Sequence, residues 1–438
     1  MIALGLVYLA LTLLADFISA ALYAATDLPE MAFLRVARDG LGLALAAVGV
    51  FNPHLPRAVR WTGLGYLGLI GVYFVAGAAD SQRPLLLVVS AAQLSIPVVL
   101  TLVGAGSLSS PSGVRMASAL TIFLGVASAL FGMWDSRNTD FWTNVIAYGD
   151  YLYEVKRIQV GYHPITLLPW NFFGFEGVRR AAGLVAAPLA QGAFLSIVGV
   201  IAFAWRRERA PVSAYLLLGL AAFGIYQSGT RGAILTLVLA LPLVVVLARV
   251  RSANARGAGV GLDIVLLTIG LAFSFQTLAF IFSYTVGLED GSTIGHVRAL
   301  QRNLRDLPGV IFLGEGLSAA GAAAADAGLD IAGGGEGSIF SIAFQIGVPG
   351  AIVFLAFCAA ISRGLNQVRR SGGEFINLAA ALIALLISSA IHLASSETLL
   401  SVSGMGSFWV LVGAVVASHR SAAAKPADQP DSNERRIP

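Results

Sequence analysis

The sequence predicts an all-α polytopic membrane protein with about 12 transmembrane helices and two long extracytoplasmic loops. Its mean hydropathy is +0.80, and only 12% of its 438 residues are charged, which is too few to cover a water-exposed surface. Apolar runs of ~20 residues recur along the chain, which is the length needed to cross the hydrocarbon core of a bilayer. Because lipid offers the backbone no hydrogen-bond partners, each spanning segment is expected to be a helix.

Twelve apolar segments are candidate spans, and we find no internal repeat among them. The first has no Lys or Arg before its apolar core, which disfavours a cleaved signal peptide, so we interpret it as a spanning helix. The spans cover approximately residues 2–23, 36–52, 61–79, 84–104, 117–134, 183–205, 212–228, 232–249, 262–282, 338–362, 376–394 and 400–418.

The basic residues between the spans predict their orientation. With both termini in the cytoplasm, sixteen Lys and Arg residues fall on the cytoplasmic side, as the positive-inside rule requires. The short outer loops then hold four, namely Arg35, Arg38, Arg83 and Arg231. Residues 1–418 therefore form one transmembrane domain, with long external loops at about 135–182 and 283–337. Residues 419–438 are polar, contain Pro and Asp, and are predicted to be a disordered cytoplasmic tail.

Composition argues against several classes of function. The basic residues behind the net charge of +4 are scattered between apolar runs, so nucleic acid is not a predicted partner. Cys358 is the single cysteine, which rules out a disulfide within the chain and disfavours a thiol-ligated metal. The five histidines lack metal-ligand spacing. We therefore expect neither a structural metal nor a cofactor.

The second long loop contains an amphipathic pattern between Ser292, a candidate N-cap, and Pro308. Its apolar side carries Val297, Leu300, Leu304 and Leu307, and its opposite side carries Arg298, Arg302 and Arg305. Such a helix would lie along the outer membrane surface. Its arginines would meet either lipid headgroups, as in an interfacial anchor, or an anionic ligand.

Glu336 is the candidate general base of this loop. It follows three glycines and precedes the apolar helix that begins near Ser338, where a carboxylate also suits the helix dipole. His296 is a second possible site residue, but its place near the apolar side of the amphipathic helix favours a structural role. The Gly/Ala-rich segment 314–335 between them is interpreted as a mobile cover.

Arg231 lies in the tight outer turn Ser228-Gly229-Thr230-Arg231-Gly232. A cation is electrostatically misplaced at the start of a helix unless helix N–H groups and guanidinium together hold a phosphate. The alternative is an arginine that reaches lipid headgroups.

The first long loop carries Arg179 and Arg180 just before the next span, and it is rich in aromatic residues. Such rings form either an interfacial belt or stacking surfaces for sugar. They are Trp142, Tyr148, Tyr151, Tyr153, Tyr162, Trp170, Phe172, Phe173 and Phe175. Asp150, Glu154 and Glu176 are candidate hydroxyl-binding groups.

Four segments, in this order, resemble the O-antigen ligase and polysaccharide polymerase superfamily of bacterial inner membranes. They are Arg179-Arg180-Ala-Ala-Gly183 with Pro188; Thr230-Arg231-Gly232; Gly295-His296-Val297-Arg298 with Pro308 and Gly314-Glu315-Gly316; and Glu336 to Leu355, with Gly347-Val348-Pro349-Gly350. They cover about residues 179–355, and their order and spacing carry the resemblance together with the large outer loops.

The resemblance implies a glycosyltransferase with a glycosyltransferase-C-like bundle that acts without metal on the outer face of the inner (cytoplasmic) membrane. A hydroxyl of an acceptor glycan would attack the anomeric carbon of a glycan carried on undecaprenyl diphosphate. Glu336, Arg231 and Arg298 would be catalytic. The diphosphate would be bound by Arg179, Arg180, Arg231, Arg302 and Arg305. A chain-length regulator and a flippase are further candidate partners.

Three alternatives accompany this prediction. Ligases of the superfamily usually carry a histidine, often His-Asn, where this chain has Glu336-Gly337, which favours a polymerase over a ligase that joins glycan to lipid A core. A lipid-linked sugar flippase or secondary transporter also suits twelve spans, but the long loops are external and few charges fall within the spans. A scaffold subunit of an envelope complex is the third alternative.

Overall fold

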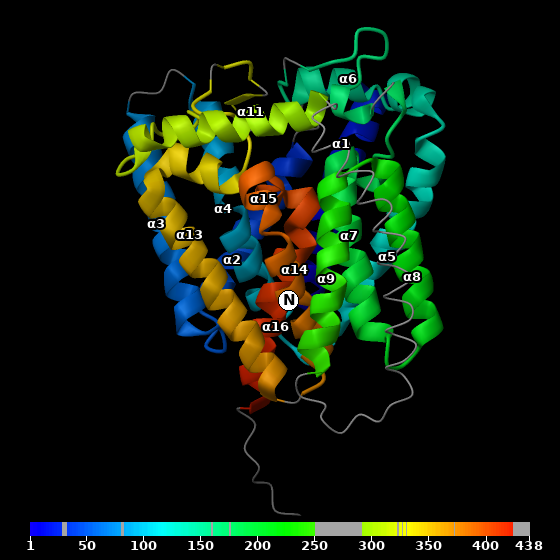
Figure 1. The fold of residues 1–438 in the computed structure, drawn as a ribbon, viewed down its shortest axis with the longest axis vertical. Helices are drawn as coiled ribbons and strands as arrows, with labels where there is room; N and C mark the ends of the chain where they lie inside the picture. Colours follow the sequence, from blue (N-terminus) through cyan, green and yellow to red (C-terminus); the bar gives the residue numbers. More distant parts are fainter. Residues whose placement is uncertain are drawn as a thin grey trace, which may run out of the picture.

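A computed structural model describes most of the chain as helices. The residues it describes are 1–28, 33–79, 83–158, 161–174, 177–249, 291–321, 324–325, 327–329, 331–371 and 373–423. The long helices run side by side in one bundle, and a single helix, α11 (Gly291–Asp306), lies across one end of it (Figure 1). We call this end the outer end, because both long loops lie there.

Within the described ranges, nine segments are long and apolar enough to cross a membrane, as expected for a multi-pass α-helical membrane protein. Eight are the single helices α1 (Ile2–Thr26), α3 (Arg57–Ala78), α4 (Pro84–Ser107), α5 (Pro111–Asp135), α7 (Pro188–Arg206), α8 (Pro211–Ser228), α9 (Arg231–Arg249) and α13 (Ser338–Ser371). The ninth joins α14 (Ile376–Ser388) and α15 (Ile391–Ser395).

The predicted number of twelve spans remains a prediction. The predicted spans at 36–52 and 400–418 are helices, α2 (Phe33–Val50) and α16 (Val402–Ala423), but they are not among the nine. The predicted span at 262–282 lies outside the described residues. Helix α16 continues to Ala423, five residues into the predicted tail, and the rest of the tail also lies outside the described residues.

Two predicted spans are interrupted rather than continuous. Helix α13 breaks at Ile346 and Gly347, where Gly347 has φ +79°. Pro349 explains the break, because it cannot donate to the carbonyl of Gln345 and its ring clashes with a continuing helix, while glycine tolerates the positive φ. The segment predicted at 376–394 likewise divides into α14 and α15.

Short helices fill the described part of the first long loop. They are η2 (Phe141–Val145), α6 (Tyr148–Asp150), η3 (Tyr151–Val155), η4 (Trp170–Phe172) and η6 (Gly183–Val185). In the second long loop α11 is followed by η7 (Leu307–Val310), and η8 (Thr398–Leu400) precedes α16.

Glycines allow the central helices to approach closely. A Cβ on Gly104 of α4 would lie 1.9 Å from the carbonyl oxygen of Val410, and one on Gly413 of α16 would lie 1.8 Å from that of Thr101. In lipid, where the hydrophobic effect does not drive helices together, small residues allow the close van der Waals packing that does. The α4–α16 contact therefore forms the centre of the bundle.

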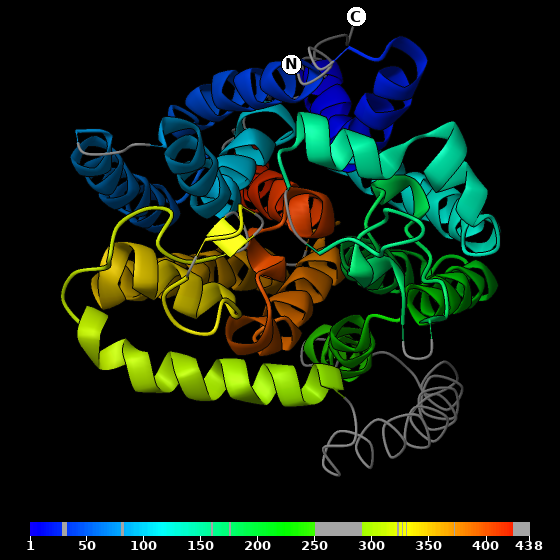
Figure 2. The same ribbon diagram turned by 90° about the horizontal axis from the view of Figure 1, so that it is seen from above.

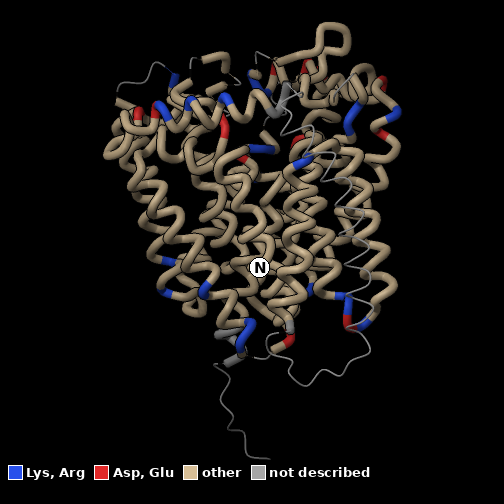
Figure 3. Tube along the Cα trace, in the orientation of Figure 1, with Lys and Arg blue, Asp and Glu red and all other residues tan. Residues whose placement is uncertain are grey.

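Charged residues gather at the two ends of the bundle, and the middle is almost free of them (Figure 3). This distribution is what a hydrocarbon layer requires, because a charge at its centre is costly to solvate. The outer end therefore collects the polar groups that any chemistry needs.

We expect Gly413→Ala to destabilise the bundle, because the added methyl would force α4 and α16 apart. Overpacking of this kind costs about 1–3 kcal/mol. The measurement is the fraction of folded protein that survives heating in detergent, followed by size-exclusion chromatography. Gly68→Ala in α3 is the matched control, because a Cβ there meets no atom within 4 Å. Equal heat resistance of the two variants would contradict the packing argument.

Candidate functional site

Helix α11 is attached to the glycine loop before α13 through Asn303. The Asn303 side chain is 1% exposed. Its Nδ2 donates to the carbonyl oxygen of Glu336 at 2.8 Å, and its Oδ1 accepts from the N–H of Gly334 at 2.7 Å. A Cβ on Gly334 would lie 2.2 Å from the carbonyl oxygen of Ala299, so glycine is needed for this close approach. Asn303 was not identified from the sequence. Its place between the apolar and the arginine positions of an amphipathic helix could have indicated a buried polar contact.

Glu336 and His296 form a direct pair. The Nδ1 atom of His296, on α11, is hydrogen-bonded to Oε2 of Glu336, and both side chains are partly exposed. This bond suits both a structural role for His296, which links α11 to the loop, and a role beside Glu336 in a site. A carboxylate that holds one imidazole nitrogen orients the ring and stabilises its protonated form.

Helix α15 lies between the Glu336 segment and the Arg231 segment. A Cβ on Gly337 would lie 2.9 Å from the carbonyl oxygen of Leu393, and one on Gly232 would lie 2.7 Å from Cε1 of His392. Glu336 and Arg231 thus each precede a glycine that packs on α15. The two glycines contact neighbouring residues of that helix, Leu393 and His392. The structure therefore brings the segments that carry these two predicted residues into contact with the same short helix.

The turn that carries Arg231 also contacts the first long loop. The N–H of Ala181 donates to the carbonyl oxygen of Gln227 at 3.0 Å. Gly229 has φ +62°, and a Cβ there would lie 3.0 Å from Nε of Arg180. The predicted residue Arg180 therefore packs against the turn that holds Arg231, two cationic groups at one end of the bundle.

Arg179 lies in a different setting from Arg180. Its guanidinium is 4.6 Å from the centre of the Phe172 ring and donates to the carbonyl oxygens of Phe172 and Arg180. Burial lowers the pKa of Arg179 to about 10, while the Asp135 carboxylate opposes that shift. Asp135, which is fully buried, accepts from the N–H of Gly183 at 2.6 Å and also holds the loop. These contacts tie Arg179 to the loop structure, and its predicted role in binding diphosphate stays a prediction.

The three arginines of α11 lie on a different face of the helix from His296 and Asn303. Arg298 is exposed and two residues from His296, and residues at this spacing do not share a helix face. Arg302 and Arg305 are exposed and lie 3.6 and 3.1 Å from the carboxylate of Asp306. Arg302 also donates to the carbonyl oxygen of Ile331 at 3.3 Å, in the loop that leads to Glu336. The catalytic role of Arg298 stays a prediction.

A polar network under the Gly/Ala-rich segment was not anticipated. Gln93 of α4 donates to Oε2 of Glu397 at 2.8 Å, and a Cβ on Gly321 would lie 2.9 Å from Oε1 of the same carboxylate. The backbone N–H and Oγ of Ser338 both donate to the carbonyl oxygen of Ser396 at 2.9 Å. Glu397 therefore lies close to the Glu336 segment, and only its position in an outer turn hinted at this in the sequence.

His392 joins this network to α9. Its Nε2 lies 3.1 Å from Oγ1 of Thr236, and its Nδ1 lies 2.9 Å from Oγ of Ser396. The imidazole is 4% exposed. These bonds hold α15 against the first turns of α9, and so hold the two halves of the candidate site together.

Four of the predicted aromatic residues of the first long loop are buried against one another, and Phe175 lies outside the described residues. Trp142, Tyr148, Tyr151 and Phe172 are at most 3% exposed and form a small core of their own. They are not available as sugar-stacking surfaces, whereas Tyr153 and Trp170 are about half exposed. Asp150 is exposed, Glu154 lies 3.7 Å from Arg157, and Glu176 lies outside the described residues.

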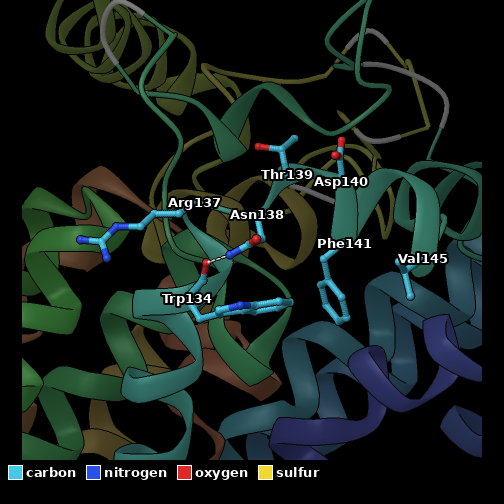
Figure 4. Close-up of a pocket in the computed structure, with 7 residues that line it drawn as sticks. All are labelled: Trp134, Arg137, Asn138, Thr139, Asp140, Phe141 and Val145. Atoms are coloured by element: carbon cyan, nitrogen blue, oxygen red, sulfur yellow. Dashed lines mark hydrogen bonds between the residues drawn. The ribbon is translucent and has the colours of Figure 1, made fainter.

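A hollow of about 530 Å³ lies where α5 meets the first long loop, but it gathers no predicted site residue. Figure 4 shows Trp134 beside Phe141, while Thr139 and Asp140 project to the opposite side. The exposed Trp134 suits the boundary between lipid and water.

Comparisons with known proteins do not identify the chain, since no family model matches it and no curated protein matches it. Among the described residues, no group of three or more His, Cys, Asp and Glu side chains is placed to hold a metal ion. The candidate site therefore consists of the His296–Glu336 pair, the Arg231 turn with Arg180, and α15 between them.

We expect Asn303→Ala to loosen α11 from the glycine loop. Loss of a buried hydrogen bond costs about 1–3 kcal/mol, so exchange of the Gly334 amide hydrogen should accelerate about tenfold or more. Hydrogen–deuterium exchange of the peptide that contains Gly334 measures this. Asn303→Asp keeps the acceptor for Gly334 and should preserve more protection, and the exposed Gln301→Ala is the control. Unchanged exchange in Asn303→Ala would contradict the attachment.

Proposed function

We propose that this protein is a glycosyltransferase of the bacterial inner membrane, a polymerase of lipid-linked glycan units. Its donor is a glycan on undecaprenyl diphosphate, its acceptor is a sugar hydroxyl of a second glycan, and it needs no metal. The observation that supports the proposal best is the arrangement around α15. The segment that carries the carboxylate–imidazole pair and the cationic turn both pack on this helix.

The carboxylate–imidazole pair and the cationic turn suit the two charges that develop in glycosyl transfer. The acceptor oxygen forms a bond to the anomeric carbon as the bond from that carbon to the diphosphate oxygen breaks. The hydroxyl proton passes to the His296–Glu336 pair, and undecaprenyl diphosphate leaves with the electron pair. Arg231 and Arg180 stabilise the negative charge on the leaving diphosphate. A direct attack of this kind inverts the anomeric configuration.

The pair revises the role predicted for Glu336 alone. With Nδ1 of His296 held by the carboxylate, the two groups act as one base, and the imidazolium that forms is stabilised by Glu336. An imidazole in this position also reduces the difference from ligases that carry a histidine. The preference for a polymerase therefore rests on the Glu336-Gly337 sequence and remains a proposal.

We expect Glu336→Gln, His296→Gln and Arg231→Ala each to reduce polymer formation by about 10²-fold or more, because each removes a general base or a group that stabilises charge. The measurement is polymer length and initial rate with purified protein and lipid-linked repeat units. The double variant His296→Gln/Glu336→Gln should lose little more than either single variant, because groups that act as a unit are not additive.

The matched controls lie at the opposite end of the bundle. Arg115 and Glu374 form a partly exposed ion pair at 2.8 Å, so Arg115→Ala and Glu374→Gln make the same chemical changes far from the site. Such a pair contributes at most about 1 kcal/mol to stability. Full polymerisation by the three site variants, at normal expression, would overturn the assignment.

Two further conditions separate the proposed class from the alternatives. A new glycosidic linkage should form in detergent, where no sealed membrane exists and a flippase or transporter has no compartment to fill. Activity should persist in EDTA. Product formed only in sealed vesicles would favour transport, and loss of activity in EDTA would contradict the metal-independent mechanism.

A further inference from the structure

Helix α11 has three faces, about a third of a turn apart at ~100° per residue. One face packs on the protein through Ala299 and Asn303, which are 9% and 1% exposed. A second carries Arg298, Arg302 and Arg305. The third carries Val297, Leu300 and Leu304, whose side chains are 38%, 36% and 56% exposed. The predicted apolar side of the helix thus forms an uncovered stripe, except for Leu307, which is half buried.

The exposed apolar stripe continues into the segment after η7. Ile311, Phe312 and Leu313 are 45%, 83% and 73% exposed. Six large apolar side chains of α11 and the adjoining segment therefore project away from the protein, although helix α11 itself is too polar to be a span. The stripe ends at Glu315, which is exposed but whose N–H is bonded to the carbonyl oxygen of Phe344.

Contacts of the following segment show how deep it lies. The N–H of Gly314 donates to the Tyr73 hydroxyl at 3.3 Å, and the Ser90 hydroxyl donates to that of Ser318 at 3.2 Å. Tyr73 lies five residues before the end of α3, and Ser90 lies six residues after the start of α4. At 1.5 Å per residue these positions are about 7–9 Å inside the outer ends of the helices. Residues 314–318 therefore reach down between the outer turns of α3 and α4.

The position of α11 agrees with this depth. It lies at the outer ends of the long helices and along one edge of the bundle (Figures 1 and 2). Peptide groups at membrane depth must find partners within the protein, and those of Gly314 and Glu315 do so. The side chains of Ile311, Phe312 and Leu313, which directly precede these two residues, are exposed instead.

We propose that α11 and residues 311–313 bind the outer lipid monolayer as one surface. Acyl chains contact Val297, Leu300, Leu304 and Phe312, and headgroup phosphates meet Arg298 and the neighbouring arginines of the opposite face. Because Asn303 and His296 attach the same helix to Glu336, this contact holds the His296–Glu336 pair at the boundary between lipid and water. The surface does not depend on the transferase activity.

The test places nitroxide labels on single cysteines of the full chain in a Cys358→Ser background. Leu304→Cys and Phe312→Cys report the apolar stripe, and Arg305→Cys is the matched control one residue away on the arginine face. The protein is reconstituted in vesicles of phosphatidylethanolamine and phosphatidylglycerol. Collision of each label with oxygen, which concentrates in lipid, is compared with collision with a water-soluble nickel complex.

We expect the oxygen-to-nickel collision ratio to be several-fold higher at residues 304 and 312 than at residue 305. All three side chains are exposed, so the labels should leave the fold intact, and size-exclusion chromatography checks this. A ratio at 304 and 312 equal to that at 305 would overturn the proposal. Inactive protein with the expected ratios would instead count against the proposed function and leave the lipid surface standing.

Discussion

The inability of hydrocarbon to solvate charges and unpaired peptide groups shapes the whole molecule. It restricts the middle of the bundle to apolar helices, which approach one another through glycines such as Gly104 and Gly413. It moves the charged side chains to the two ends (Figure 3). Irregular backbone at membrane depth then survives only where the protein supplies hydrogen-bond partners, as Tyr73 does for Gly314.

Short helix α15 has a larger role than its five residues suggest. Its His392 packs on Gly232 and bonds to Thr236, and its Leu393 carbonyl packs on Gly337. The candidate base and the candidate phosphate-binding turn come from segments about 100 residues apart in the sequence, and α15 holds both. The break between α14 and α15 thus lets the short helix α15 contact both segments at the outer end.

Glu336 illustrates how far the sequence could define the site. Its position after three glycines and before a helix made it a candidate, and so did the setting of Arg231 in an outer turn. The partner of Glu336 was not predictable, because His296 lies 40 residues away on a helix whose direction the sequence does not state. Arg179 and Arg180 are adjacent in sequence and equally basic, yet one stacks on Phe172 and the other packs on Gly229.

By itself, the sequence determined that this is a multi-pass α-helical membrane protein, where most helices begin and end, and that α11 is amphipathic. These features follow from the hydrophobicity of each segment and from the spacing of its apolar residues, both of which can be read from residues close together in the sequence. The tertiary structure decided which face of α11 is covered, that Asn303 attaches it, and that Ser338 bonds to Ser396, the neighbour of Glu397. Such choices depend on contacts between distant segments, whose close approach is set by packing of the whole bundle.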